Sequence, residues 1–284
     1  MDDSKFLIIG GSGQVGLALQ AKYPNARNTD SRDLDISDWD DVKDFSWDSV
    51  TTILNAAGYT NVDGAETAEG RVAAWKVNAV GVANLARIAS EKDLVLVHVS
   101  TDYVFDGTQK LHTEDEPLSP ISTYGASKAA GDVAISVHAK HYILRTSWVI
   151  GDGKNFVRTM LGLGQKGVAP TVVHDQVGRL TFTSVLVGAI DHLLSTQSPF
   201  GVYNVSNEGE PVSWADITRT IFHEAGFDLN VNNTTTAEYY QGKAGIAPRP
   251  LNSILDLHKI EAARFMPNNW HDDLSDYIKK ELEK

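Results

Sequence analysis

Short apolar runs and amphipathic segments alternate through the first half of the chain. The runs are rich in Val, Ile and Leu, while the segments between them carry apolar residues at helical spacing. We expect strands at 5–10, 51–58, 94–100 and 141–151, and helices at 11–23, 73–92 and 124–140. Runs that are apolar throughout are typical of parallel strands covered on both faces. The alternation therefore predicts an α/β fold with a doubly wound parallel sheet of the Rossmann type.

After residue 150 the alternation is less regular. The spacing predicts helices at 155–167, 183–195 and 214–226, the last with Ser213 as its N-cap, and a strand follows at 202–207. The Asn- and Thr-rich segment at 230–253 is expected to be loop. The pattern indicates one compact unit in which the second half adds a smaller lobe to a nucleotide-binding core.

Composition excludes several classes of protein. The 284 residues carry a formal net charge of -12 and show no cluster of Lys and Arg, so we expect no nucleic-acid partner. No apolar run approaches the roughly 20 residues of a membrane span, and the acidic start does not resemble a signal peptide. There are no cysteines to form disulfides or bind metal. We expect a cytoplasmic protein without a membrane partner.

Three glycines, Gly10, Gly13 and Gly16, stand between the first predicted strand and the first predicted helix. Glycine permits a tight turn and close backbone approach to a diphosphate, and the helix N-terminus offers free N–H donors. This context favours a dinucleotide-binding site over an ordinary turn.

The residues that follow the next predicted strand concern the adenosine end of the cofactor. Asp30 stands where an acidic residue binds the ribose hydroxyls, and Arg32 could instead receive a 2′-phosphate. Asp35 and Ile36 are expected beside the adenine. The pair Asp30 and Arg32 leaves NADH and NADPH both open.

The segment "YGASK" places Tyr124 and Lys128 four residues apart. On a helix such residues share a face, which also occurs in many helices without chemistry. The surrounding motifs decide between these interpretations. They are "GGSGQVG", "NAAGYTNVDGAE", "VNAVGVANLA", "HVSTDYVFDG", "PISTYGASKAAGD", "ILRTSWVIG", "NFVRTML", "DQVGRLT" and "RPLNS".

Together these motifs resemble the extended short-chain dehydrogenase/reductase family, and within it the dTDP-4-dehydrorhamnose reductases, over residues 10–253. The resemblance implies a Rossmann core and a smaller C-terminal α/β substrate lobe. We expect the core at 1–150, with 180–205 returning to it, and the lobe mainly at 151–179 and 206–284.

The resemblance also implies an activity: reduction of the C4 ketone of dTDP-4-dehydro-6-deoxy-L-mannose to dTDP-L-rhamnose with NADH or NADPH. Tyr124 would protonate the carbonyl oxygen, and Thr101 would hydrogen-bond the same oxygen. Lys128 would lower the pKa of Tyr124 and hold the nicotinamide ribose.

Further positions take roles from the family pattern. The expected cofactor contacts are Gly13, Gln14, Val15, Ala57, Gly58, Tyr59 and Asn78. The expected substrate contacts are Asp102, Trp148, Asn155, Phe156 and Arg249. Ordinary structural roles stay open for several of them: helix packing for Asn78, a turn cap for Asp102, core packing for Trp148, and a surface position for Arg249.

The chain departs from the pattern at two positions. Some members dimerise through a metal bridged by glutamates, and Ala18 stands where one of those glutamates would be. We therefore predict no such metal site, and a monomer or weak homodimer. Leu180 stands where a proline is usual, which is a small change in the substrate loop.

Other functions compete with this one. A reductase of another nucleotide-linked 4-keto sugar would show the same motifs. A regulatory subunit resembling that of methionine adenosyltransferase would not need the catalytic set, and an epimerase would retain its cofactor. The presence of Thr101, Tyr124 and Lys128 together favours an enzyme.

Overall fold

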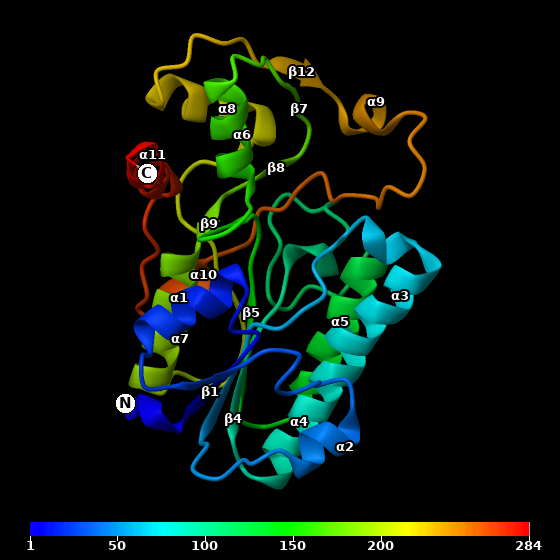
Figure 1. Ribbon diagram of the computed structural model, residues 1–284, viewed down its shortest axis with the longest axis vertical. Helices are drawn as coiled ribbons and strands as arrows, with labels where there is room; N and C mark the ends of the chain where they lie inside the picture. Colours follow the sequence, from blue (N-terminus) through cyan, green and yellow to red (C-terminus); the bar gives the residue numbers. More distant parts are fainter. Residues whose placement is uncertain (284) are drawn as a thin grey trace.

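A six-stranded parallel sheet forms the centre of the protein, which we describe from a computed structural model for residues 1–283. The strand order is β10-β5-β4-β3-β1-β2. The strands are β1 (Phe6–Ile9), β2 (Arg27–Thr29), β3 (Thr52–Asn55), β4 (Val95–Val99), β5 (His141–Arg145) and β10 (Gly201–Asn204). Helices cover both faces, which confirms the predicted doubly wound α/β fold (Figure 1).

Two helical layers enclose this sheet (Figure 1). One contains α1 (Gln14–Lys22), α7 (Thr183–Thr196) and α10 (His258–Ala262). The other contains α2 (Trp39–Asp44), α3 (Ala68–Trp75), α4 (Val82–Glu91) and α5 (Thr123–Ser136). Single-turn 3-10 helices occur at η1 (Asp3–Lys5), η2 (Gly64–Glu66) and η4 (Asp102–Val104).

The β1 strand shows why its sequence is apolar at every position. Phe6 and Ile8 pack into the cluster under α1 and α7, while Leu7 and Ile9 pack into the cluster under α2 and α4. Successive strand residues point to opposite faces, so a strand buried on both faces needs an apolar residue each time.

The smaller lobe lies above the carboxyl edge of the sheet in Figure 1. Its helices are α6 (Phe156–Gln165), α8 (Trp214–Glu224), α9 (Thr236–Tyr240) and α11 (Trp270–Leu282). Its short strands form three pairs: β11 (Val212–Ser213) with β8 (Val177–Gly178), β12 (Asn232–Thr234) with β7 (Thr171–Val173), and β6 (Val149–Ile150) with β9 (Thr181–Phe182). These elements share a third apolar cluster, which includes Leu161, Ile221 and Leu274.

Several predicted elements differ from the observed ones. The helix expected at 73–92 begins at Ala68 and passes through a π-helical segment, η3 (Lys76–Gly81), before α4. The strand expected at 141–151 stops at Arg145, and its last part becomes β6, because Trp148 adopts φ 48° and turns the chain toward β9.

The segment 230–253 is not entirely loop, so that prediction was wrong in part. It contains β12, which forms by pairing with the distant β7, and α9, whose N-cap Thr235 forms a capping box with Glu238. The predicted N-cap of α8 is confirmed, since Ser213 accepts a hydrogen bond from Asp216 N and forms a capping box.

Residues from the second half also complete the main sheet. β10 is its edge strand, α7 packs against α1, and Ile260 of α10 joins the same apolar cluster. This packing supports the proposed return of 180–205 to the core, and it adds α10 to that core. None of the helices within residues 1–283 has the length and apolar character to cross a membrane.

From the packing of α7 we predict how much the segment 180–205 stabilises the core. Leu186 is fully buried in the cluster between α7 and the sheet. We expect Leu186→Ala to lower the free energy of unfolding by about 2–5 kcal/mol, since it leaves a cavity that the surroundings cannot fill. The matched control is Val133→Ala on α5, where the side chain is 57% exposed; its effect should stay within about 0.5 kcal/mol. Urea unfolding measures both, and equal effects would contradict this packing.

Candidate active site

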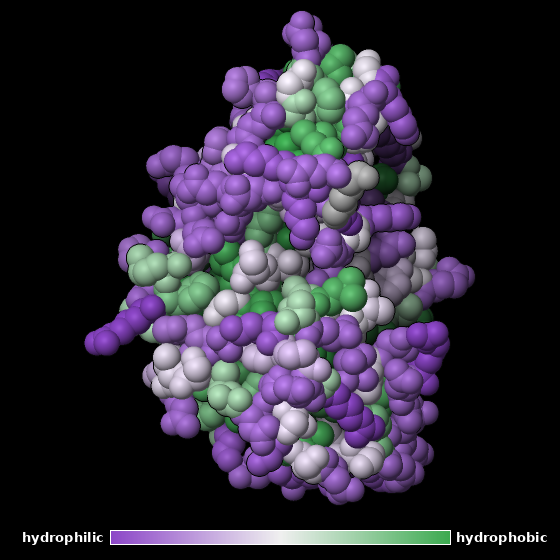
Figure 2. Space-filling view, turned by 60° about the vertical axis from the view of Figure 1, so that its left-hand side comes forward, coloured by the Kyte–Doolittle hydropathy of each residue, from purple (hydrophilic) through white to green (hydrophobic). Residues whose placement is uncertain are grey.

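A groove at the carboxyl edge of the sheet collects most of the predicted site residues. It consists of two adjoining cavities of about 430 Å³ and 550 Å³ that share Gly13, Ala57 and Gly58 in their walls. Carboxyl ends of parallel strands are where doubly wound proteins bind ligands. On the face drawn in Figure 2, apolar side chains gather at mid-height and again near the top, and much of the remaining surface is hydrophilic.

The glycine turn occupies one wall of the larger cavity. Gly10 has φ +84°, and a Cβ there would lie 2.5 Å from Ala57 N on the neighbouring strand end. A Cβ on Gly16 would lie 2.1 Å from Gly10 O, so the turn and α1 can meet only without side chains. Gly13 is the N-cap of α1 and no side chain caps it. The first N–H groups of α1 can therefore donate to an anion.

Gln14 and Val15 both line the smaller cavity. The Gln14 side chain also accepts a hydrogen bond from Gly151 N at 3.0 Å. Gln14 thereby joins the glycine turn to the chain that enters the lobe, in addition to its place in the groove.

At the far end of the larger cavity Asp30 and Arg32 pair with each other. Arg32 Nη2 lies 2.6 Å from Asp30 Oδ2, and its Nε donates to Oδ1 at 3.1 Å. This pairing lowers the pKa of Asp30 to about 2. Asp35 and Ile36 line the same cavity, as expected for the adenosine end. This end of the cavity thus presents both a carboxylate and a guanidinium, so the structure does not decide whether the cofactor is NADH or NADPH.

Asn78 has a structural position behind the groove. It is fully buried on the π-helical segment, accepts a hydrogen bond from Tyr59 N at 2.8 Å and donates to Tyr59 O at 3.1 Å. It also donates to Ser127 Oγ at 3.0 Å. Asn78 does not line either cavity of the groove. It holds the Tyr59 loop, which does line the larger cavity, against α5.

Thr101, Tyr124 and Lys128 all line the smaller cavity. Thr101 follows β4, and the other two lie on the first turns of α5, which Ser122 caps by accepting from Gly125 N at 3.1 Å. A Cβ on Gly125 would lie 2.2 Å from Tyr103 O, so this glycine allows α5 to approach the loop after β4. The fold therefore brings together the three residues that the motifs single out.

Burial controls the electrostatics of these groups. The Tyr124 side chain is almost fully buried, and burial raises its pKa above that of a free phenol; the Thr101 hydroxyl opposes this, while Asp102 and Asp132 add to it. Burial also lowers the pKa of Lys128 to about 8. Burial thus shifts the Tyr124 pKa in the direction opposite to the lowering expected from Lys128.

Asp102 lies beside the same cavity and is almost fully buried. Its Oδ1 accepts a hydrogen bond from Thr101 Oγ1 at 3.0 Å. Burial raises the pKa of Asp102 to about 6, and the hydroxyls of Ser253 and Thr101 oppose the rise. Asp102 is thus more than a turn cap, since it fixes the direction in which the Thr101 hydroxyl donates.

The other predicted substrate residues lie at different distances from the groove. Trp148 lines the smaller cavity and stacks on Trp214 of the lobe with ring centroids 3.8 Å apart. Asn155 and Phe156 do not line the groove. Asn155 caps α6 and donates to Gly151 O at 2.9 Å, while Phe156 packs on Trp214.

Arg249 is neither exposed nor at the surface of the loop. Its Nη2 donates to Asp63 Oδ1 at 2.7 Å, and its side chain is 13% exposed. Coulombic interaction links it to Tyr103, which lines the smaller cavity. The Arg249 side chain is therefore mostly buried rather than at the surface, and its guanidinium joins the segment after α9 to the Asp63 loop.

Sequence reasoning did not single out several groove residues. Ser12, Ser100, Tyr103 and Thr146 line its walls. Ser12, Ser100 and Tyr103 are sequence neighbours of predicted site residues, so adjacency was a usable signal. Thr146 follows β5, and only the strand order brings it to the groove.

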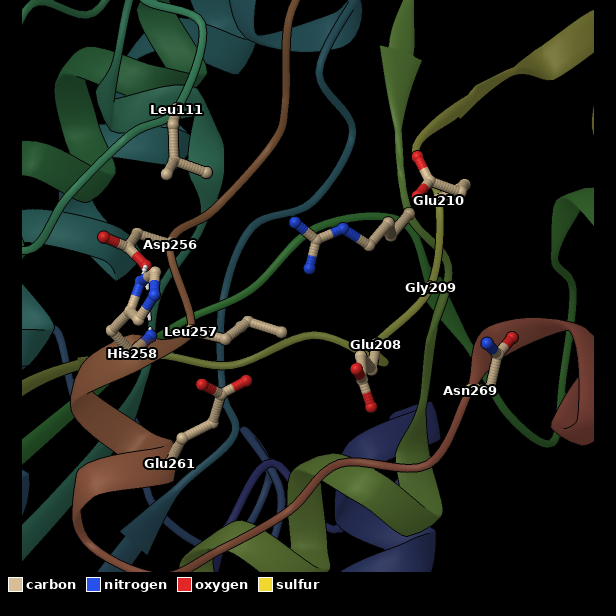
Figure 3. Close-up of a pocket in the computed structure, with 10 residues that line it drawn as sticks. Leu111, Glu208, Gly209, Glu210, Asp256, Leu257, His258, Glu261 and Asn269 are labelled. Atoms are coloured by element: carbon tan, nitrogen blue, oxygen red, sulfur yellow. Dashed lines mark hydrogen bonds and ion pairs between the residues drawn. The ribbon is translucent and has the colours of Figure 1, made fainter.

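A further cavity of about 470 Å³ lies on another part of the molecule, near α10 and the start of α11. Figure 3 shows the carboxylates of Glu208, Glu210, Asp256 and Glu261 around it, from segments far apart in the sequence. It contains none of the predicted site residues. Within residues 1–283 there is no group of three or more His, Cys, Asp or Glu side chains arranged to hold a metal ion.

Comparison with known proteins agrees with this geometry. Residues 4–283 match the family described as "RmlD substrate binding domain". A dTDP-4-dehydrorhamnose reductase from Aggregatibacter actinomycetemcomitans is 36% identical, over 94% of this chain and 96% of that protein. The chain belongs to the dTDP-4-dehydrorhamnose reductase family.

This family membership confirms the resemblance inferred from the motifs, and it makes the chain an NAD(P)H-dependent reductase. Another member of the family, a dTDP-4-dehydrorhamnose reductase from Bacillus anthracis, has a crystal structure in complex with NADP. It is 33% identical, covers 97% of this chain and 98% of its own, and superposes with a TM-score of 0.88. A dTDP-4-keto-6-deoxy-D-glucose reductase from Streptomyces niveus is 35% identical over 79% of this chain and 80% of that protein.

The glycine turn yields a test of cofactor binding. We expect Gly16→Ala to weaken NADPH binding at least about tenfold, because its methyl group would force the turn away from α1 and spoil the diphosphate site. Gly162→Ala is the matched control: it lies within α6 with no heavy atom near the new methyl, and should stabilise by about 0.5–1 kcal/mol. Fluorescence titration with NADPH and thermal unfolding separate the two, and unchanged binding in Gly16→Ala would contradict the site.

Asp102 yields a prediction on pH dependence. Its folded pKa of about 6 lies above the ordinary value of 3.8. The folded chain therefore retains a proton that the unfolded chain has released, and this group's contribution to stability falls as pH rises through that window. We expect the stability of Asp102→Asn relative to wild type to rise by roughly 2–3 kcal/mol between about pH 4 and pH 7. Urea unfolding at several pH values measures it, and a constant difference would contradict the raised pKa.

Proposed function

We propose that this enzyme reduces the C4 ketone of dTDP-4-dehydro-6-deoxy-L-mannose (dTDP-4-dehydrorhamnose) to dTDP-L-rhamnose. The observation that carries the proposal is that Thr101, Tyr124 and Lys128 line one cavity, which is continuous with the cavity at the glycine turn. A cofactor laid along the groove would have its diphosphate at the N-terminus of α1 and its nicotinamide near Tyr124. When bound, the reduced nicotinamide would supply the hydride.

In this proposal the proton comes from Tyr124. Burial raises the pKa of Tyr124, so the phenol holds its proton at neutral pH and can donate it to the substrate oxygen. Hydride addition to C4 would place negative charge on its oxygen until Tyr124 protonates it, and the Thr101 hydroxyl, a possible donor to that oxygen, lies in the same wall. In the free protein Thr101 donates its single hydroxyl proton to Asp102 Oδ1 at 3.0 Å, so it would have to turn this proton from Asp102 to the substrate oxygen.

The binding roles follow from placement along the groove. Gly13, Gln14 and Val15 would hold the diphosphate, and Asp30 or Arg32 the adenosine ribose. Lys128 would hold the nicotinamide ribose, and the Tyr59 loop would border the cofactor.

The substrate would occupy the wall beyond Tyr124. Trp148 and Asp102 would contact the sugar, since both line the smaller cavity. Arg249 would bind the diphosphate, for which a forked guanidinium is suited. Asn155 and Phe156 would contact thymidine only if the nucleotide extends from the groove to the start of α6. We also propose a cytoplasmic monomer or weak homodimer.

A second candidate is reduction of another dTDP-linked 4-keto sugar. It is favoured by the similarity to the Streptomyces niveus protein, whose name specifies a dTDP-4-keto-6-deoxy-D-glucose substrate. The two activities share the cofactor, the proton donor and the C4 ketone. They differ in the stereochemistry of the sugar, which assays with both sugars would separate.

The decisive test is Tyr124→Phe, which removes the phenolic hydroxyl that would donate the proton and keeps the aromatic ring. We expect kcat for the dTDP-4-keto sugar to fall about 10²–10⁴-fold, while NADPH binding changes little. Loss of absorbance by NADPH and by NADH measures turnover and also settles the cofactor preference. Tyr23→Phe is the control, because its hydroxyl bonds Asp191 at 3.1 Å, away from the groove. Wild-type protein that binds a cofactor but reduces neither sugar would overturn the proposed function.

A further inference from the structure

The short turn η2 contacts the helix that carries Tyr124, and the roles described above do not use this contact. The turn belongs to the motif "NAAGYTNVDGAE" and ends at Glu66. Glu66 Oε1 accepts a hydrogen bond from Thr123 N at 2.8 Å, and Glu66 Oε2 accepts one from Thr123 Oγ1 at 2.9 Å. One carboxylate thus binds both donors of the first residue of α5.

These two hydrogen bonds lie at the least restrained part of the helix. The first N–H groups of an α-helix have no partner within the helix, and helix ends fray. Thr123 N is one of these groups, and Glu66 accepts from it. Gly125 N is another, and Ser122 Oγ accepts from it at 3.1 Å. Tyr124 lies between these two anchored residues, so the position of its backbone depends on both.

The turn that presents Glu66 is itself held in place. Gly64 N donates to Asn61 Oδ1 at 3.0 Å. A Cβ on Gly70 would clash with Gly64 O, so α3 packs directly on the backbone of the turn. The Glu66 carboxylate is therefore offered from a fixed backbone, which allows it to hold the start of α5 in one place.

The same turn also packs on the Tyr124 side chain. Ala65 is fully buried and shares one apolar cluster with Ala74 of α3 and with Tyr124. The Tyr103 ring meets the Tyr124 ring edge to face, with centroids 5.5 Å apart. In Figure 1, α3 and α5 lie side by side, and they contact each other. Apolar contacts are not directional, so they let the helix shift, whereas the hydrogen bonds from Glu66 fix its first residue.

We propose that Glu66 is a positioning residue that acts through Thr123: its two hydrogen bonds hold the first turn of α5 so that the Tyr124 phenol faces the substrate carbonyl. The inference rests on the proposed function, in which Tyr124 donates the proton. Glu66 does not line either cavity of the groove, so its effect on the reaction is indirect. Displacing a reacting group by about 1 Å can cost about 10²-fold in rate. Loss of the contact at Thr123 should therefore slow the proton transfer and leave binding almost unchanged.

The first test compares Glu66→Ala with Glu66→Gln in the full chain. Alanine removes both acceptors. Glutamine keeps both hydrogen bonds without the charge, because its oxygen can accept from Thr123 N and its nitrogen can donate to Thr123 Oγ1. With NADPH and the dTDP-4-keto sugar that the wild type reduces, we expect Glu66→Ala to lower kcat about 10–100-fold, with KM and NADPH affinity changed less than about threefold. Glu66→Gln should keep kcat within about threefold of wild type.

Thr123→Ala is a milder variant, because it removes only the hydroxyl bond to Glu66. It should lower kcat about threefold. Wild-type kcat in both alanine variants, or a glutamine variant as impaired as Glu66→Ala, would overturn the inference. The matched control is Glu69→Ala, since Glu69 is an exposed carboxylate in the first turn of α3. This control should leave kcat unchanged.

A double-mutant cycle shows whether the effect passes through Tyr124. If Glu66 acts through the phenol, Glu66→Ala should change the residual rate of Tyr124→Phe by less than about twofold, because the phenol is already absent. The same fold-loss in both backgrounds would show a general disturbance of the groove and overturn the inference.

The last measurement needs no substrate. Amide hydrogen exchange reads the Thr123 N–H directly, and we expect its protection to fall at least about tenfold in Glu66→Ala and to persist in Glu66→Gln. Equal protection in Glu66→Ala and wild type would overturn the inference, whichever sugar the enzyme reduces. Wild-type protein that binds a cofactor but reduces neither sugar would instead overturn the proposed function, so the two failures are distinguishable.

Discussion

Parallel hydrogen bonding of six strands is the constraint on which the rest of this structure depends. Because neighbouring strands run in the same direction, their carboxyl ends meet at one edge, and the residues that follow them become neighbours. Gly10 follows β1, Ala57 follows β3, Thr101 follows β4 and Thr146 follows β5. Residues separated by more than a hundred positions thereby line one groove. Substitutions that weaken strand pairing would disperse the site even if no groove residue changed.

Close approach of backbones is the second condition. α1 can begin at the glycine turn only because Gly16 has no Cβ, and α5 can reach the loop after β4 only because Gly125 has none. The positions of α1, which begins at the glycine turn, and of α5, which carries Tyr124 and Lys128, thus depend on glycines that have no side chain. This placement buries Tyr124 and Lys128, and burial is the largest influence on the pKa of each. The same burial makes each unsatisfied hydrogen bond costly.

The local elements of the core follow from the chain itself. Alternate residues of β1 are buried on opposite faces of the sheet, so every position of this strand is apolar. The helical spacing of apolar residues after Ser213, together with the capping side chain of Ser213, predicts where α8 begins. The glycine turn and "YGASK" are contiguous in sequence, so their internal geometry depends on local chemistry. For these parts the sequence was sufficient to predict the fold class and the family, while the cofactor-binding residues and the proton donor stay predictions.

Tertiary structure decided what depends on distant partners. β12 and α9 formed within a segment expected to be loop, because β7 offers unpaired backbone groups to the Asn- and Thr-rich chain. Asn78 hydrogen-bonds the backbone of the Tyr59 loop, and Arg249 forms an ion pair with Asp63. Thr146 lines the groove. The pKa of Tyr124 rose although a lysine follows it by one helical turn. The sequence by itself determined which chemical groups the site contains, through local spacing, whereas their burial, hydrogen-bond direction and charge arose only from packing between segments far apart in the chain.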